Sequence, residues 1–106
     1  MAWIYLFIAG LLEVVWAYFL KESNGFSRLA PSAVTIATMI ASFGLLSMSM
    51  RTLPLGTAYA VWTGIGAVGT FAVGIVAHGE TMSATRMASA MLIITGLVMM
   101  KLSSPP

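Results

Sequence analysis

The sequence predicts an all-α membrane protein with four transmembrane helices, and three observations lead to this fold class. Of the 106 residues, 59% are apolar and only 8% are charged, and the mean hydropathy is +0.98. Soluble domains carry about 25% charged residues, so this composition excludes a soluble enzyme. The apolar residues form four runs, each close to the roughly 20 residues that a helix needs to cross a bilayer. Only short polar connections separate the runs, which predicts a single domain over residues 1–106.

The first two runs are bounded by clear turn and charge signals. The first covers residues 3–20 and ends before an Asn-Gly turn, a strong breaker of helices. The second covers residues 29–50 and has Pro31 in its first turn, where the missing backbone N–H costs nothing. It stops at Arg51, ahead of a short link to the third run.

The third run, residues 55–77, contains several glycines and closes at the sequence His-Gly-Glu. The fourth, residues 82–100, carries Arg86 in its first turns and ends at Lys101. Its uncharged core is slightly short for a span, so we expect its first turn to lie in the membrane interface.

Glu13 is the most informative residue, because it is the only charged side chain in the first run. At about 1.5 Å per residue, it lies close to the middle of the bilayer. An ionised side chain there costs at least a few kcal/mol, so an intramembrane carboxyl indicates a functional site. The alternative is a protonated carboxyl that only joins helices by hydrogen bonds. We favour a functional role because of the neighbouring faces.

Side chains three and four residues apart share a helix face, which predicts three polar or aromatic stripes. These stripes hold Ala9, Gly10, Trp16 and Ala17 beside Glu13; Thr35, Thr38, Ser42 and Ser49; and Tyr59, Trp62, Thr63, Gly66 and Thr70. We expect any single Ser or Thr to bond a carbonyl of its own helix. Trp3 and Tyr5 suit the membrane interface, whereas Tyr59 and Trp62 lie inside a run, so we favour a binding role for these two.

Aromatic faces, hydroxyls and one carboxyl together predict a cation site. A carboxyl screened from water is stable when it holds a proton or when a cation lies beside it. If two copies of Glu13 share one cavity, a bound cation expels protons and protons expel the cation. This exclusion predicts proton-coupled antiport.

Four helices enclose too little interior for a transport path, so we expect the chain to oligomerise. Arg51 and Lys101 lie on the side of the N-terminus, and Lys21, Arg28 and Arg86 lie on the other. Orientation follows the excess of Lys and Arg, and here the excess is one residue. We predict insertion in both orientations and an antiparallel homodimer. A single, weakly preferred orientation fits the charge counts equally well.

Several classes of site find no support in the sequence. It has no cysteine and one histidine, so it offers no disulfide and no metal cluster. Its basic residues are scattered singly, which argues against a nucleic-acid partner. We see no catalytic triad and no phosphate-binding loop, and therefore expect neither an enzyme nor a cofactor.

Three segments resemble the small multidrug resistance family: LEVVWA at residues 12–17, SNGFSR at 23–28 and LPLGTAYAVWTGIG at 53–66. The resemblance extends over nearly the whole chain. Within the family the chain is more similar to the guanidinium exporter branch than to the exporters of quaternary ammonium drugs. The indications are Trp16 near Glu13, where the drug branch has a small residue, and the sequence Trp62-Thr63-Gly64, where the drug branch has a serine after the tryptophan.

The resemblance implies a dual-topology antiparallel homodimer in a bacterial inner membrane, surrounded by lipid, that exports guanidinium ion in exchange for protons. It places the central carboxylate at Glu13 and the supporting residues at Gly10, Trp16, Ser42, Tyr59 and Trp62. Trp16 and Ser42 are then expected to donate hydrogen bonds to Glu13, and Tyr59 to act in gating. Guanidinium fits such a site because it is planar, presents donors in a fork and stacks on aromatic rings.

The resemblance also implies roles for small residues. Gly64 and Gly66 correspond to the family's helix kink, and Ser89 and Gly96 to its dimerisation face. His78 departs from the family pattern, and we expect it to be a loop residue rather than a proton relay.

Other functions remain as alternatives. A drug exporter of the same fold needs room for larger aromatic cations, which Trp16 argues against. A small channel conducts without coupling, but an acid in mid-membrane binds ions too tightly for fast passage. A non-transporting accessory subunit needs no such acid.

Overall fold

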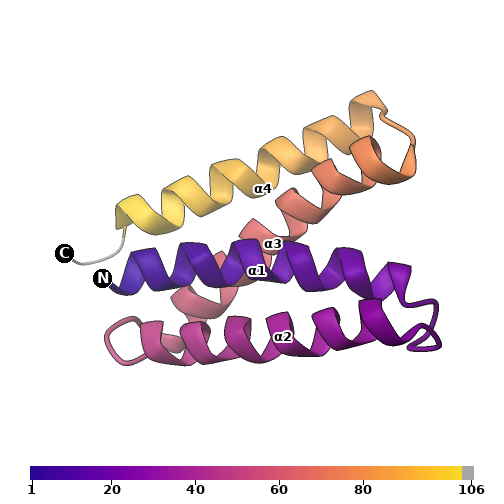
Figure 1. The fold of residues 1–106 in the computed structure, drawn as a ribbon. Helices are drawn as coiled ribbons and strands as arrows, with labels where there is room; N and C mark the ends of the chain where they lie inside the picture. Colours follow the sequence, from indigo (N-terminus) through magenta and orange to yellow (C-terminus); the bar gives the residue numbers. More distant parts are fainter. Residues whose placement is uncertain (104–106) are drawn as a thin grey trace.

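The computed structural model describes residues 1–103 and consists of four helices (Figure 1). They are α1 (Ala2–Glu22), α2 (Leu29–Ser49), α3 (Leu55–His78) and α4 (Ala84–Ser103). All four are long and apolar enough to cross a membrane. The all-helical class with four membrane-spanning helices is therefore confirmed. The last three residues of the expected domain, 104–106, lie outside the described residues.

Local signals explain where the helices begin and end. The turn between α1 and α2 contains three successive residues with positive φ, Asn24, Gly25 and Phe26, as the Asn-Gly signal predicts. Gly79 ends α3 in the left-handed conformation, with φ of 63°. The helix α4 begins at Ala84, later than expected, because the Ser83 hydroxyl accepts a hydrogen bond from the Arg86 backbone N–H at 3.1 Å.

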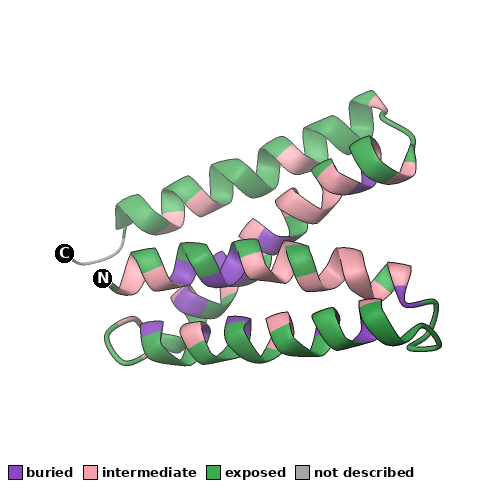
Figure 2. Ribbon diagram, in the orientation of Figure 1, coloured by how far each residue is buried: buried purple, intermediate pink, exposed green. Residues whose placement is uncertain are grey.

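The helices do not form a symmetric bundle. The helix α1 packs against both α2 and α3, whereas α4 packs only against α3 and stands apart from the rest (Figure 1). The helix α4 has no buried residue in this chain (Figure 2). The apolar core lies toward the N-terminal half of α1 and consists of Leu6, Ala9, Leu46, Ala58, Val61 and Trp62.

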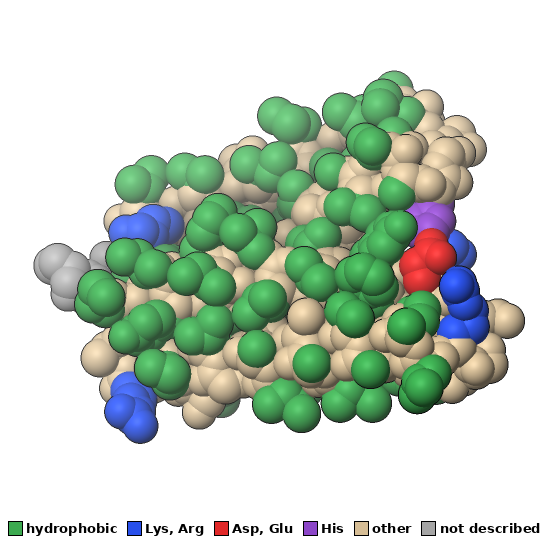
Figure 3. Space-filling model, in the orientation of Figure 1, with side chains coloured by type: hydrophobic (Ala, Val, Ile, Leu, Met, Phe, Trp, Pro, Cys, Tyr) green, Lys and Arg blue, Asp and Glu red, His purple; other side chains and the backbone are tan. Residues whose placement is uncertain are grey.

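Apart from Glu13, the charged side chains of the described residues lie near the two ends of the helices. The N-terminus and the α2–α3 turn lie at one end, hereafter the N-terminal end, and the α1–α2 and α3–α4 turns lie at the opposite end (Figure 1). On the face shown in Figure 3, basic side chains appear at both ends, while acidic side chains gather at the opposite end beside the histidine. The apolar side chains between the two ends match the band that lipid tails cover.

Candidate functional site

Glu13 lies halfway along α1 and packs against α3 at Gly66. A Cβ atom at position 66 would overlap the Glu13 carboxyl, so the carboxyl occupies the space that a side chain at Gly66 would fill. The Oε1 atom of Glu13 is buried and has no hydrogen-bond partner among the described residues. One carboxyl oxygen is thus withdrawn from water without a donor from this chain.

Trp16 lies one turn after Glu13 on α1, and its indole Nε1 is also buried without a partner in the described part of the chain. The expected hydrogen bond from Trp16 to Glu13 is therefore not formed here. The Trp16 ring instead meets the Phe43 ring edge-on, with centroids 6.4 Å apart. A buried N–H donor and a buried carboxyl oxygen, both unpaired, leave the region able to bind a polar ligand.

Ser42 joins three helices rather than contacting Glu13. Its hydroxyl donates to the Ala9 carbonyl of α1 at 2.7 Å and accepts a hydrogen bond from the Trp62 indole of α3 at 3.0 Å. The expected donation from Ser42 to Glu13 is wrong in this structure, because the single hydroxyl proton is already used at Ala9. Ser42 holds Trp62 in place.

The other hydroxyls of α2 behave as expected for membrane helices. Thr35 donates to the Pro31 carbonyl, Thr38 to the Val34 carbonyl and Ser49 to the Leu46 carbonyl, all within 2.7–2.8 Å. Ser42 is the exception in this stripe.

Aromatic rings from three helices form a string beside the carboxyl. From Trp16 the string passes to Phe43, then to Trp62 at 5.7 Å and to Tyr59 at a further 5.7 Å between centroids. Phe43 was not among the residues predicted from the sequence. Nothing in its spacing separates it from the ordinary apolar residues of α2, and only the packing of α2 brings it between the two tryptophans.

The predicted stripe on α3 divides into two faces. Trp62 and Gly66 are buried, with Trp62 against Ser42 and Phe43 of α2 and Gly66 against Glu13 of α1, whereas Tyr59 and Thr63 are exposed in the single chain. Residues 62 and 66 are one turn apart, as are 59 and 63, and the two pairs are offset around the helix by about 60°. The predicted residues are therefore neighbours on the surface of α3, but they do not all face the same neighbouring helix.

The glycines predicted to support the site and the kink allow close helix packing. A Cβ atom on Gly10 would lie 2.6 Å from Ile65 of α3, so Gly10 lets α1 approach α3. Gly64 faces Leu97 of α4, while Gly66 faces Glu13. The helix α3 is continuous from Leu55 to His78. A kink at Gly64 and Gly66 stays a prediction.

Ser89 and Gly96 lie on α4, away from Glu13. Both are exposed, and a Cβ atom on Gly96 would meet nothing within 4 Å. The Ser89 hydroxyl donates to the Thr85 carbonyl of its own helix at 2.9 Å.

His78 is the last residue of α3 rather than a loop residue, which corrects the expectation. Its ring lies 5.4 Å from the Tyr18 ring, and its Nε2 lies 3.5 Å from a Glu22 carboxyl oxygen. Glu22 is also 3.8 Å from Arg28. These contacts join α1 and α3 at the opposite end.

Within residues 1–103 no group of three His, Asp or Glu side chains is placed to hold a metal ion.

Comparison with known proteins identifies the family. Residues 1–93 match the family model described as Small Multidrug Resistance protein. The chain belongs to the small multidrug resistance family. With its four apolar spans, this family member is a multi-pass protein of the bacterial inner membrane.

Three full-length relatives show how similar this member is to proteins of established name. Each is called a guanidinium exporter. The proteins of Citrobacter freundii, Escherichia coli K12 and Proteus vulgaris are 60%, 58% and 55% identical over 104 residues. Each match covers 98% of this chain and 99–100% of the relative. The predicted resemblance is confirmed.

Proposed function

We propose that this protein exports guanidinium ion in exchange for protons, with Glu13 as the group that holds either one. The observation that carries the proposal is the buried, unpartnered Glu13 carboxyl oxygen halfway along a membrane-spanning helix. Such a group is stable only with a proton or a cation beside it. The names of the relatives support guanidinium as the cation.

The side chains around Glu13 suit guanidinium. This cation is planar and donates hydrogen bonds in a fork that matches a carboxylate. It also stacks on aromatic rings, and the string Trp16, Phe43 and Trp62 begins one helical turn from Glu13. In this proposal the unpaired Trp16 indole N–H orients the carboxylate, and Ser42 positions Trp62 through their hydrogen bond.

Exchange follows from competition at one carboxyl. A proton on Glu13 removes the charge that attracts guanidinium, and a bound guanidinium excludes the proton. An empty, ionised site is the costly state, because it leaves an unpaired charge in the membrane. Movement of the site from one side to the other is therefore favoured only when the site is loaded, which couples export to proton entry.

The proposed assembly is an antiparallel, dual-topology homodimer. Three observations support a second copy: α4 has no buried residue, Ser89 and Gly96 leave open space on it, and Tyr59 and Thr63 are exposed. A second copy would bring another Glu13 to the same cavity and enclose the open ends of the aromatic string. The two copies of Tyr59 would then compete for one contact and gate the two sides.

The test is uptake of radiolabelled guanidinium into proteoliposomes against a proton gradient. Glu13→Gln keeps the shape of the side chain but removes its titration, and we expect proton-driven uptake to fall to the level of empty vesicles. Glu22→Gln is the matched control, because it makes the same change at the exposed end of the same helix. We expect it to retain most of the uptake.

Proton-driven uptake by Glu13→Gln would refute the proposal. A tetraalkylammonium competitor distinguishes the drug-exporter alternative. If the wild-type protein carries only such bulky cations and not guanidinium, the chain acts as a drug exporter. The presence of the large Trp16 side chain near Glu13 would then have no explanation.

A further inference from the structure

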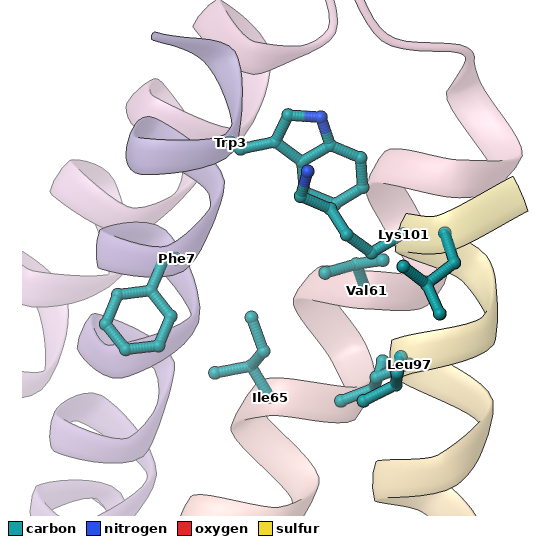
Figure 4. Close-up of a pocket in the computed structure, with 8 residues that line it drawn as sticks. Trp3, Phe7, Val61, Ile65, Leu97 and Lys101 are labelled. Carbon is teal, nitrogen blue, oxygen red and sulfur yellow. The ribbon is translucent and has the colours of Figure 1, made fainter. Parts of the chain in front are cut away.

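An apolar groove of the chain is distinct from the site around Glu13. It has a volume of about 370 Å³ and lies between α1, α3 and α4 toward the N-terminal end. Its walls include Trp3, Phe7, Val61, Ile65 and Leu97, and Lys101 lies at its mouth (Figure 4). The groove exists because α1 and α4 do not pack against each other, although both pack on α3.

Lys101 and Trp3 close the outer end of the groove. The Lys101 side chain reaches from α4 toward α1, and its Nζ lies 4.6 Å from the centre of the Trp3 ring (Figure 4). Both residues lie near the ends of their helices, at the depth where lipid headgroups meet water and where tryptophan and lysine are enriched. The groove below them runs into the apolar part of the membrane.

Among the described residues, the charged side chains of the N-terminal end are all basic. It holds Lys101, Arg51 and the N-terminal amine, and no Asp or Glu side chain lies there among residues 1–103. The three glutamates of the sequence lie at mid-membrane and at the opposite end. Within residues 1–103, Lys101 therefore has an aromatic partner but no carboxylate partner.

A second groove provides a comparison within the molecule. It has a volume of about 280 Å³ and lies between α3 and α4 toward the opposite end. The Arg86 guanidinium covers the Phe71 ring there at 5.2 Å, much as Lys101 covers Trp3. Arg86 also lies 3.5 Å from a Glu80 carboxyl oxygen, so its charge already has a partner. Of these two grooves, the one at Lys101 combines apolar walls with a cation that no carboxylate of residues 1–103 neutralises.

We propose that this groove binds an anionic phospholipid, with one acyl chain along Phe7, Ile65 and Leu97 and the headgroup phosphate on Lys101. The apolar walls match the hydrocarbon chain, and the unneutralised ammonium matches the phosphate. Trp3 contributes an aromatic surface at the level of the headgroup. The lipid would fill the gap between α1 and α4 and fix the spacing of α4 from the rest of the chain.

The test is lipid retention measured by native mass spectrometry on the delipidated full-length protein in detergent. The protein is offered equal amounts of phosphatidylglycerol and phosphatidylcholine with identical acyl chains. We expect phosphatidylglycerol to be retained about fivefold more, the ratio that corresponds to about 1 kcal/mol for one basic residue at an anionic headgroup. Lys101→Gln should abolish this preference. Arg51→Gln, which removes the other basic side chain of the same end outside the groove, should keep it.

A second pair of variants tests the apolar part of the groove. Val98→Trp places an indole in the groove and leaves Lys101 unchanged, and we expect it to lower retention of both lipids severalfold. Ile4→Trp adds the same indole to an exposed position of α1 outside the groove and should have no such effect.

Three results would overturn the proposal. One is equal retention of the two lipids by the wild-type protein, and another is a phosphatidylglycerol preference that survives Lys101→Gln. The third is a Val98→Trp variant that dissociates into monomers while its lipid retention stays unchanged, since this result would assign the groove to a second copy of the chain.

Discussion

Because Gly66 has no side chain, the Glu13 carboxyl can pack directly against α3. The carboxyl fills the space beside α3 that any Cβ at that position would take. The sequence identified Glu13 because a lone charge in an apolar run is unusual, and it placed Gly66 on a relevant stripe. That the two residues touch depends on how α1 crosses α3, which no local pattern encodes.

Gly66→Ala is expected to displace the Glu13 carboxyl. Forcing a methyl group into a filled space costs about 1–3 kcal/mol, and here the displaced group is the proposed binding group. We expect guanidinium uptake in proteoliposomes to fall at least about tenfold. Gly56→Ala on the same helix, where a Cβ would meet nothing within 4 Å, should leave uptake unchanged. Wild-type uptake by Gly66→Ala would show that the carboxyl does not need this position.

Ser42→Ala is expected to loosen the contact of three helices. It removes the bond to the Ala9 carbonyl and leaves the buried Trp62 indole without an acceptor. Hydrogen bonds between membrane helices contribute on the order of 1 kcal/mol each, so we expect a loss of about 1–2 kcal/mol in the free energy of unfolding.

Denaturation in mixed micelles with increasing SDS measures this loss. Ser49→Ala is the control, because Ser49 is equally buried on α2 but bonds only the Leu46 carbonyl of its own helix. Equal losses for the two variants would contradict the bridging role of Ser42.

Among the helices, α4 differs most from the others, because it has one helical neighbour and no buried residue (Figure 2). A membrane helix with so little contact in its own chain has surface available for another helix. The resemblance to the family implied that Ser89 and Gly96 belong to its dimerisation face. Both residues are exposed in the structure, which leaves this face accessible to a second copy.

Gly96→Leu is expected to weaken the dimer without unfolding the chain. The space around Gly96 is open in the single chain, so the larger side chain has no internal clash. A partner helix seated on this face would be pushed away. We expect at least about a tenfold loss of dimer in cross-linking or single-molecule counting in membranes, and little loss for Gly96→Ala. A fully dimeric Gly96→Leu variant would place the interface elsewhere.

At the scale of the whole molecule, the distribution of basic residues is nearly symmetric between the two ends. Arg51 and Lys101 lie at the N-terminal end, and Lys21, Arg28 and Arg86 at the other, as the order of the spans predicts. The acidic side chains Glu22 and Glu80 do not change this balance greatly, since acidic residues contribute little to orientation. Neither orientation of the chain is therefore strongly favoured.

The prediction for the whole molecule is insertion in both orientations. Fusions of the C-terminus to a cytoplasmic and to a periplasmic reporter should both be active, each at a substantial fraction of a singly oriented control. Three added lysines in the α1–α2 turn should fix one orientation and remove one of the two signals. Activity of only one reporter in the unmodified protein would contradict dual topology.

The sequence by itself determined the number of spans, their approximate limits, the depth of Glu13 and the side of every basic residue. These properties are local or additive: hydropathy sets the spans, the Asn-Gly turn and Gly79 set their ends, and the order of spans sets the sides. The three segments that resemble the family were enough to indicate the family without any knowledge of the packing.

Only the tertiary structure decided which side chains meet. It showed that Ser42 bonds Ala9 and Trp62, that Phe43 joins the aromatic string, that the α3 stripe divides, and that Lys101 reaches Trp3. The physical reason is that the residues of one helix face are spread over a wide arc around the helix axis, and only some of them contact a neighbouring helix. The crossing of neighbouring helices selects a few residues from that arc, and these crossings depend on side-chain volumes from distant parts of the chain.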